Sequence, residues 1–177
     1  LSAATVTTTY AQTDEQPPEQ TEHPAPTVED QVLALLNQHR AAVGCPALTA
    51  NEHLATAARW HAEDMAINDF FGHTGSNGSH FSERISAAGY AWARASETIA
   101  AGSVDPAAIV NIWMNSPQHH DIIVNCELRE VGVAHVYQTD DQPNVRLDDG
   151  SQMPALFHYW AADYAVPMPQ SPAPPAE

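Results

Sequence analysis

The positions of the prolines indicate that the folded part of this chain is its middle. The 177 residues include 14 prolines, most of which lie near the two ends of the chain. The end prolines are Pro17, Pro18, Pro24, Pro26, Pro167, Pro169, Pro172, Pro174 and Pro175. Proline fixes φ and removes a backbone donor, so helix interiors and central strands exclude it. We therefore predict a folded domain over residues 27–165, a disordered acidic and Pro-rich segment over 1–26, and a Pro-rich tail over 166–177.

The charge balance limits the partners that such a domain can have. The formal net charge is −16, and all six basic residues are arginine. A chain this acidic is not expected to bind nucleic acid or an anionic membrane through counterion release. The absence of lysine excludes mechanisms that need a Schiff-base or general-base lysine. No apolar run approaches the roughly 20 residues of a membrane-spanning helix. We expect a monomer with no transmembrane segment.

Two features favour export from the cell. The opening stretch LSAATVTTTYAQTDE resembles the end of a signal peptide, although any tail rich in Ala and Thr would look similar. Cys45 and Cys126 are compatible with one disulfide, which is typical of an oxidising compartment; the alternative is two buried free thiols. We predict a secreted protein in which the two cysteines pair.

Apolar residues at helical spacing dominate the first part of the domain. Capping residues and helix-stop residues mark where each helix begins and ends. We predict helices that begin after Thr27, after Thr49 in a capping box with Glu52, at about Phe81, after Asp105, and at Pro117. Trp60, Trp113 and Trp160 fall on apolar faces and are expected in the core.

The last third of the domain changes to the period of a strand. Apolar and small residues alternate over residues 131–137, and residues 156–160 are apolar on both faces. The second pattern predicts a central strand that is covered on both sides. The connecting residues include Asp140, Asp141, Asp148 and Asp149, which lack calcium-loop spacing and predict a solvated acidic loop. Helices first and strands later indicate an α+β fold with helical layers against a largely antiparallel sheet.

Ten histidines prompt a search for a metal site. The chain contains no His-Glu-x-x-His, no Cys-x-x-Cys and no EF-hand loop. His53 and His61 lie about 12 Å apart along one predicted helix, too far to share one zinc ion. His119 and His120 are adjacent, so their side chains diverge on a helical turn. Any metal site must therefore be assembled from distant segments.

A set of motifs in order extends over about residues 30–165. The motifs are FFGHTGSNGSHFSERISAAGY, SETIAAG, WMNSPQHHDIIVNC, REVGVA and HYWAADYA. Asn37 and Arg40, and residues 61–65, fit the same pattern. This pattern resembles the bacterial branch of the CAP superfamily, which unites cysteine-rich secretory proteins, insect venom antigens and plant pathogenesis-related proteins. The resemblance implies a three-layer α-β-α sandwich with a central, largely antiparallel sheet.

The resemblance also implies an open cavity that holds two histidines and two acidic residues. By position the histidines are His73 and His119, the first acid is Glu97, and the second acid falls at Ser116. His73 and His119 are the candidate ligands for Zn²⁺ or another divalent cation, bound weakly with water, and no organic cofactor is expected. The alternative is that both histidines only stabilise loops. Glu130 is a further candidate for the cavity, or a salt-bridge partner at a strand edge.

His80 follows His73 by seven residues and has two interpretations. It could add a third imidazole to the site, or it could lie exposed in the loop.

Two classes of function follow from the resemblance. The first is a secreted binding module for a small apolar or amphipathic ligand, such as a sterol or fatty acid, with a weak metal site. The second is a metal-assisted hydrolase, a peptidase or esterase, with His73, Glu97 and His119 as its candidate catalytic residues. A Ser116–His119–Glu97 triad can also be written, but a serine that precedes proline is better placed to cap a helix. The sequence does not decide whether catalysis occurs.

Overall fold

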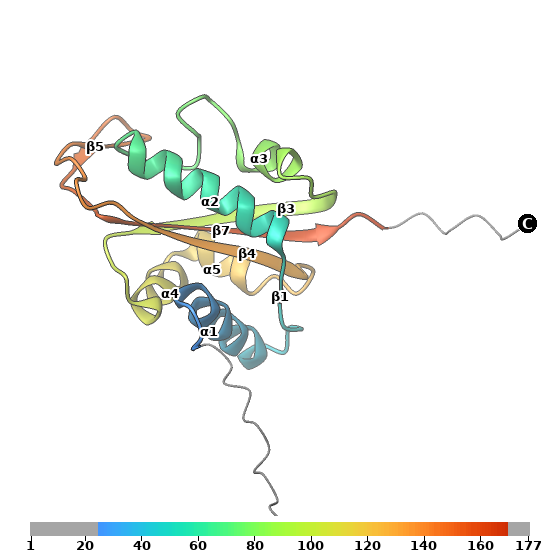
Figure 1. Cartoon of the computed structure of the whole chain (residues 1–177). Helices are drawn as coiled ribbons and strands as arrows, with labels where there is room; N and C mark the ends of the chain where they lie inside the picture. The colour runs from blue at the N-terminus through green and yellow to red at the C-terminus, as the bar shows by residue number, and fades with distance from the viewer. Residues whose placement is uncertain (1–24, 170–177) are drawn as a thin grey trace, which may run out of the picture.

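The computed structural model describes residues 25–169, so most of both predicted terminal segments lies outside the described residues. In chain order the elements are α1 (Val28–Ala42), β1 (Thr49–Ala50), α2 (Glu52–Ile67), β2 (Phe70–Phe71), α3 (Phe81–Ala87), β3 (Trp92–Ala101), α4 (Pro106–Asn115), α5 (Pro117–Ile123), β4 (Glu130–Tyr137), β5 (Val145–Leu147), β6 (Gln152–Met153) and β7 (His158–Pro167). Helices and strands alternate up to β3, after which two helices precede the last four strands (Figure 1).

The main sheet has the strand order β1-β4-β7-β3. Strand β7 pairs antiparallel with both β3 and β4, and only the short β1 pairs parallel. Helices α2 and α3 cover one face of this sheet, and α1, α4 and α5 cover the other (Figure 1). A small second sheet joins β2, β5 and β6. The predicted α+β sandwich with a largely antiparallel sheet is confirmed.

The longest edge strand was missed in the sequence. Strand β3 carries Ala, Arg, Ser and Glu side chains, which have low strand propensity and show no clear alternation. It forms because its backbone pairs with β7 from Arg94 opposite Val166 to Ala101 opposite Tyr159.

Helix α2 lies directly on the backbone of β4. A Cβ atom at Gly132 would overlap the backbone of Leu54 and Ala55, so only glycine allows this approach. The helix face against the sheet is built largely from alanine, including the buried Ala58 and Ala62. Small side chains on both elements therefore set the spacing between the helix and the sheet.

The opposite layer contains the larger core. Trp113 and Trp160 are fully buried there, and their indole N–H groups donate to the carbonyls of Ile99 and Ser103, both at 2.8 Å. The expectation for these two tryptophans is confirmed. The expectation for Trp60 is wrong, since it is 44% exposed on the outer side of α2.

Arg40 joins α1 to the segment that follows α5. Its buried guanidinium donates to the carbonyls of Pro46, Ile123, Asn125 and Leu128 at 2.8–3.0 Å. These bonds satisfy backbone acceptors near the end of a short helix, where carbonyls otherwise lack partners.

The predicted pairing of the two cysteines is confirmed. The structure contains the Cys45–Cys126 disulfide. It crosslinks the segment after α1 to the segment after α5, the same two regions that Arg40 joins.

Two local expectations were wrong. The N-cap residue of α2 is Asn51 and not Thr49, because Thr49 belongs to strand β1. Asp141 is buried instead of solvated, and its carboxylate accepts the backbone N–H groups of Leu156 and Phe157 and the hydroxyl of Tyr159.

Gly132→Ala should lower the free energy of unfolding by about 3 kcal/mol or more, because the added methyl overlaps helix backbone that cannot move aside. Urea denaturation measures the change. Gly150→Ala is the control: it has a positive φ but free space around it, so only about 1 kcal/mol is expected. Equal losses in the two variants would contradict the close approach of α2.

Candidate functional site

A buried carboxylate, Glu97, lies at the centre of the candidate site. It projects from the edge strand β3, and its side chain is inaccessible to solvent. Arg84 Nη2 donates to Oε2 at 2.7 Å, and His73 Nδ1 lies 2.9 Å from Oε1. His61 Nε2 lies 3.9 Å from the same Oε1. Burial alone would raise the pKa of Glu97, but the His73 hydrogen bond and the charges of His61 and Arg84 outweigh it and lower the pKa.

Arg84 connects α3 to this carboxylate and to the preceding loop. Its guanidinium also donates to the carbonyl of Ser79 at 2.8 Å and to the carbonyl of His73 at 3.1 Å. One buried side chain therefore holds the loop that carries His73 against the sheet.

His61 lies on α2 near the site, and its hydrogen bond stabilises the fold. It is fully buried, and its Nε2–H donates to the carbonyl of Gly72 at 2.8 Å. Burial lowers the pKa of His61, and the opposing influence of Glu97 offsets only part of this shift. Its Nδ1 is buried without a partner.

His73 and His119 form what we call the histidine pair. His73 follows β2 and its side chain is 45% exposed, whereas His119 comes from α5 in the opposite helical layer. Their ring centroids are 6.1 Å apart, with 60° between the ring planes. Burial, and then the charge of His73, lowers the pKa of His119. The two histidines were selected from the sequence, where they are 46 residues apart, and they lie close together in the structure.

The other selected residues occupy different surroundings. Ser116 is the N-cap residue of α5, but its side chain makes no capping hydrogen bond. Glu130 begins β4 and accepts a hydrogen bond from the hydroxyl of Tyr90. His80 lies exposed at the N-cap of α3, where its backbone N–H donates to Glu83.

Sequence reasoning missed a second buried acid, Asp163. It is in register with Glu97 across the β3–β7 ladder, so both side chains lie on the face covered by α2. Asp163 is fully buried, and neither carboxyl oxygen has a hydrogen-bond partner in the described part of the chain. Burial, and then the charge of Glu97, raises the pKa of Asp163 well above its usual value, with only partial compensation from Arg84. Asp163 lies in an apolar, Ala-rich strand, and nothing in the sequence around it indicates that it lies beside Glu97.

The donor set limits what metal the site can hold. Within residues 25–169, no group of three or more His, Cys, Asp or Glu side chains is arranged to bind an ion. The Nδ1–H of His73 is engaged by Glu97, which leaves the lone pair on Nε2 available. A carboxylate that orients an imidazole in this way is typical of metal-binding histidines. The histidine pair therefore fits a weak site in which water completes the coordination.

A model of the CAP family, the cysteine-rich secretory protein family, matches residues 33–164. The chain belongs to the CAP family. This match confirms the resemblance on which His73, Glu97 and His119 were selected.

Relatives of this CAP domain include two proteins of Bacillus subtilis strain 168. The chain is 33% identical over 109 residues to the uncharacterized protein YkwD, covering 61% of this chain and 42% of that protein. It is 32% identical over 107 residues to the uncharacterized membrane protein YlbC, covering 60% and 31%. The aligned part therefore spans less than half the length of either relative.

Solved structures share the fold of this CAP domain. An outer surface protein of Borrelia burgdorferi matches with a TM-score of 0.67 and 18% identity, covering 80% of this chain and 93% of that one. An extracellular protein of Bacillus anthracis that contains an SCP domain matches with a TM-score of 0.62 and 22% identity, covering 78% and 40%. In the part of the chain that the structure describes, every helix is too short or too polar to cross a membrane.

Asp163→Asn should change how stability depends on pH. A carboxyl whose folded pKa is raised stabilises the fold fully below its unfolded pKa of about 3.9, and this contribution is lost as pH rises through the folded pKa. Asparagine mimics the neutral acid at every pH. The variant should therefore gain on the wild type by up to about 1.4 kcal/mol per pH unit above pH 4.

Urea denaturation between pH 4.5 and pH 8 measures this difference. Asp149→Asn is a control, because Asp149 is exposed and its pKa is lowered by hydrogen bonds from Ser151. A constant difference between Asp163→Asn and wild type across this range would contradict a neutral buried Asp163.

Proposed function

We propose that this CAP domain is an extracellular binding module that holds a divalent cation weakly at the histidine pair and binds a small ligand without turnover. The observation that carries the proposal is the hydrogen bond from His73 Nδ1–H to the buried Glu97, with the His119 ring 6.1 Å from that of His73. This arrangement fixes one ligand nitrogen and places a second imidazole beside it.

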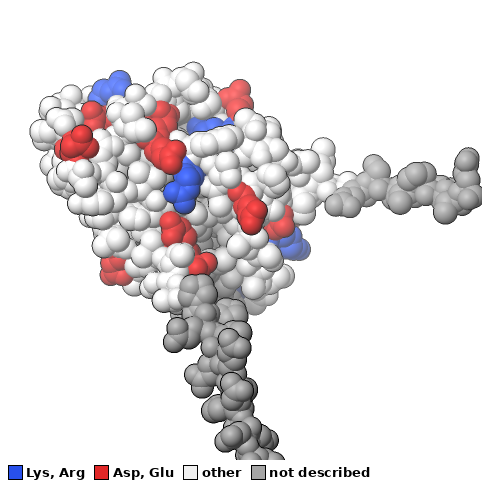
Figure 2. Space-filling model, viewed as in Figure 1, with Lys and Arg blue, Asp and Glu red and all other residues white. Residues whose placement is uncertain are grey.

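The chemistry of the pair favours Zn²⁺ or a similar ion. Imidazole nitrogens bind zinc at about 2.0–2.1 Å, and the two ring centroids lie 6.1 Å apart. Two protein ligands are fewer than the three of a typical catalytic zinc site, which supports weak binding. The net charge of −16 favours the approach of cations, although acidic and basic side chains are interspersed on the face shown in Figure 2.

The surroundings of Ser116 argue against a serine hydrolase. Among the described residues, Ser116 makes no hydrogen bond to His119, and Glu97 is held by Arg84 and His73. A nucleophile without a bound base is not activated. The second candidate is a metal-assisted hydrolase that uses His73, Glu97 and His119. It is favoured by the coordination positions that a two-histidine site leaves to water.

An apolar or amphipathic ligand, such as a sterol or fatty acid, has a candidate place between α1, α2 and β4. A hollow of about 300 Å³ there is lined by Leu33, Ala55, Val131 and Val133, among others. Glu29, Asp30 and Glu52 in the same lining disfavour an anionic head group. The apolar lining supports burial of a hydrocarbon body, worth about 0.8 kcal/mol per CH₂.

An extracellular place is supported by the Cys45–Cys126 disulfide, which is typical of oxidising compartments. The Bacillus anthracis and Borrelia burgdorferi proteins of the same fold are described as extracellular and outer surface proteins.

Zinc titration by calorimetry tests the metal site. His73→Ala/His119→Ala should weaken the binding about tenfold or more, because it removes both protein ligands. His39→Ala/His80→Ala is the matched control, since both side chains are exposed and lie outside the pair. Wild-type affinity should fall as pH drops below about 6.5, because ligand imidazoles must be neutral. The same affinity and stoichiometry in both double variants would refute the site.

Ligand binding and turnover are separated by parallel assays on the purified chain. Labelled cholesterol should bind saturably, and palmitate should bind more weakly because its carboxylate meets the acidic lining. Affinity should fall as the apolar body is shortened. Ester and peptide substrates with added Zn²⁺ should show no turnover above that of His119→Ala. Metal-dependent turnover that is lost in His119→Ala, without saturable lipid binding, would favour the hydrolase.

A further inference from the structure

Trp60 is an exposed indole that neither the core nor the histidine pair uses. Its 44% exposure contrasts with Trp113 and Trp160, which are fully buried. Indole is amphipathic, so a partly exposed tryptophan is typical of surfaces that bind ligands.

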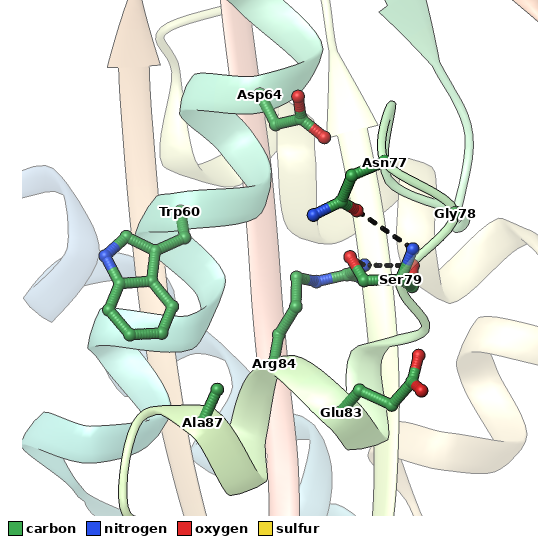
Figure 3. A pocket seen from close by; sticks show the side chains of 8 residues that line it. All are labelled: Trp60, Asp64, Asn77, Gly78, Ser79, Glu83, Arg84 and Ala87. Carbon is green, nitrogen blue, oxygen red and sulfur yellow. Dashed lines mark hydrogen bonds between the residues drawn. The ribbon is translucent and has the colours of Figure 1, made fainter.

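Trp60 forms one wall of a hollow of about 570 Å³ (Figure 3). The hollow lies between α2, the loop before α3, and α3 itself. Its lining is Trp60, Asp64, Asn77, Gly78, Ser79, Glu83, Arg84 and Ala87, so the histidine pair and Glu97 are not part of it. The volume is within the range of about 300–1,000 Å³ that holds small molecules.

The loop side of the hollow is held in place before any ligand binds. Asp64 on α2 accepts both the backbone N–H and the hydroxyl of Ser76. The Oδ1 atom of Asn77 accepts the backbone N–H of Ser79 at 2.9 Å, which leaves the amide Nδ2–H groups for a ligand (Figure 3). A binding surface ordered in advance loses less entropy when it binds.

A buried donor also lies in this lining. Arg84 is only 7% exposed, and within residues 25–169 its Nε–H has no hydrogen-bond partner, although its terminal nitrogens bind Ser79, His73 and Glu97. An unpaired buried donor is costly, so a ligand oxygen that reached it would be favoured.

The mixture of groups selects the class of ligand. The carboxylates of Asp64 and Glu83 accept hydrogen bonds and repel anions. Asn77 Nδ2–H donates hydrogen bonds, and the guanidinium of Arg84 offsets part of the negative charge of the lining. A ligand that donates and accepts without net charge, and that has a flat apolar face for the indole, meets all these conditions.

We propose that this hollow binds a neutral saccharide, with a sugar ring stacked on Trp60 and its hydroxyl groups bonded to Asp64, Glu83 and Asn77. The site is separate from the proposed metal site, although Arg84 lines the one and contacts Glu97 of the other.

The test uses the full chain and a panel of neutral saccharides: chitobiose, cellobiose, maltose and an array of longer neutral glycans. Binding is followed by calorimetry and by intrinsic fluorescence, to which the exposed Trp60 responds most directly. Trp60→Ala and Asn77→Ala should each weaken binding about tenfold or more. Tyr137→Ala, which removes another exposed aromatic, should leave it unchanged. Unchanged urea midpoints would show that the variants remain folded.

The outcomes separate this site from the histidine pair. His73→Ala/His119→Ala should retain saccharide binding, and Trp60→Ala should retain zinc binding. No saturable binding across the panel, or binding that Trp60→Ala leaves intact, would overturn the proposal. Spermidine binding that depends on Trp60, without saccharide binding, would instead assign the hollow to cationic amines.

Discussion

The buried carboxylate of Glu97 is the interaction on which the candidate site depends. A charge taken out of water is tolerated only when partners replace its hydration, and removing one partner leaves the others uncompensated. Here the partners come from α3 and from the loop after β2, through Arg84 and His73. The same bonds that neutralise Glu97 therefore fix the loop, and the loop fixes the orientation of the exposed imidazole.

The neighbouring Asp163 shows that the buried positive charge near Glu97 balances one carboxylate but not two. Two carboxyl groups lie side by side on adjacent strands, but among the described residues Arg84 hydrogen-bonds Glu97 and not Asp163. One carboxylate is ionised and paired, and the other is held neutral by burial. This division leaves the interior under α2 without net excess charge, and it keeps Glu97 as the acceptor for His73. Arg84 also links this interior to the hollow beside Trp60, so one side chain borders both proposed binding regions.

The sequence predicted the helices and the core strands well because their signals are local. Caps at Thr27 and Asp105 and the apolar run before residue 160 act over a few residues. Strand β3 had no such signal, since its Ala, Ser and Glu side chains become a strand only through pairing with β7. Trp60 was misassigned because helical spacing does not show which side of an Ala-rich helix meets the sheet.

The sequence by itself determined the fold class, the family and the choice of His73, Glu97 and His119. The order and spacing of the motifs can be read along the chain without knowledge of the structure. Only the tertiary structure decided how these residues meet. His73 follows β2 and His119 belongs to α5, yet their ring centroids lie 6.1 Å apart. Asp163 lies beside Glu97 through strand register alone. Contacts between residues far apart in the chain depend on strand order and layer packing, and neither is encoded in the local spacing of side chains.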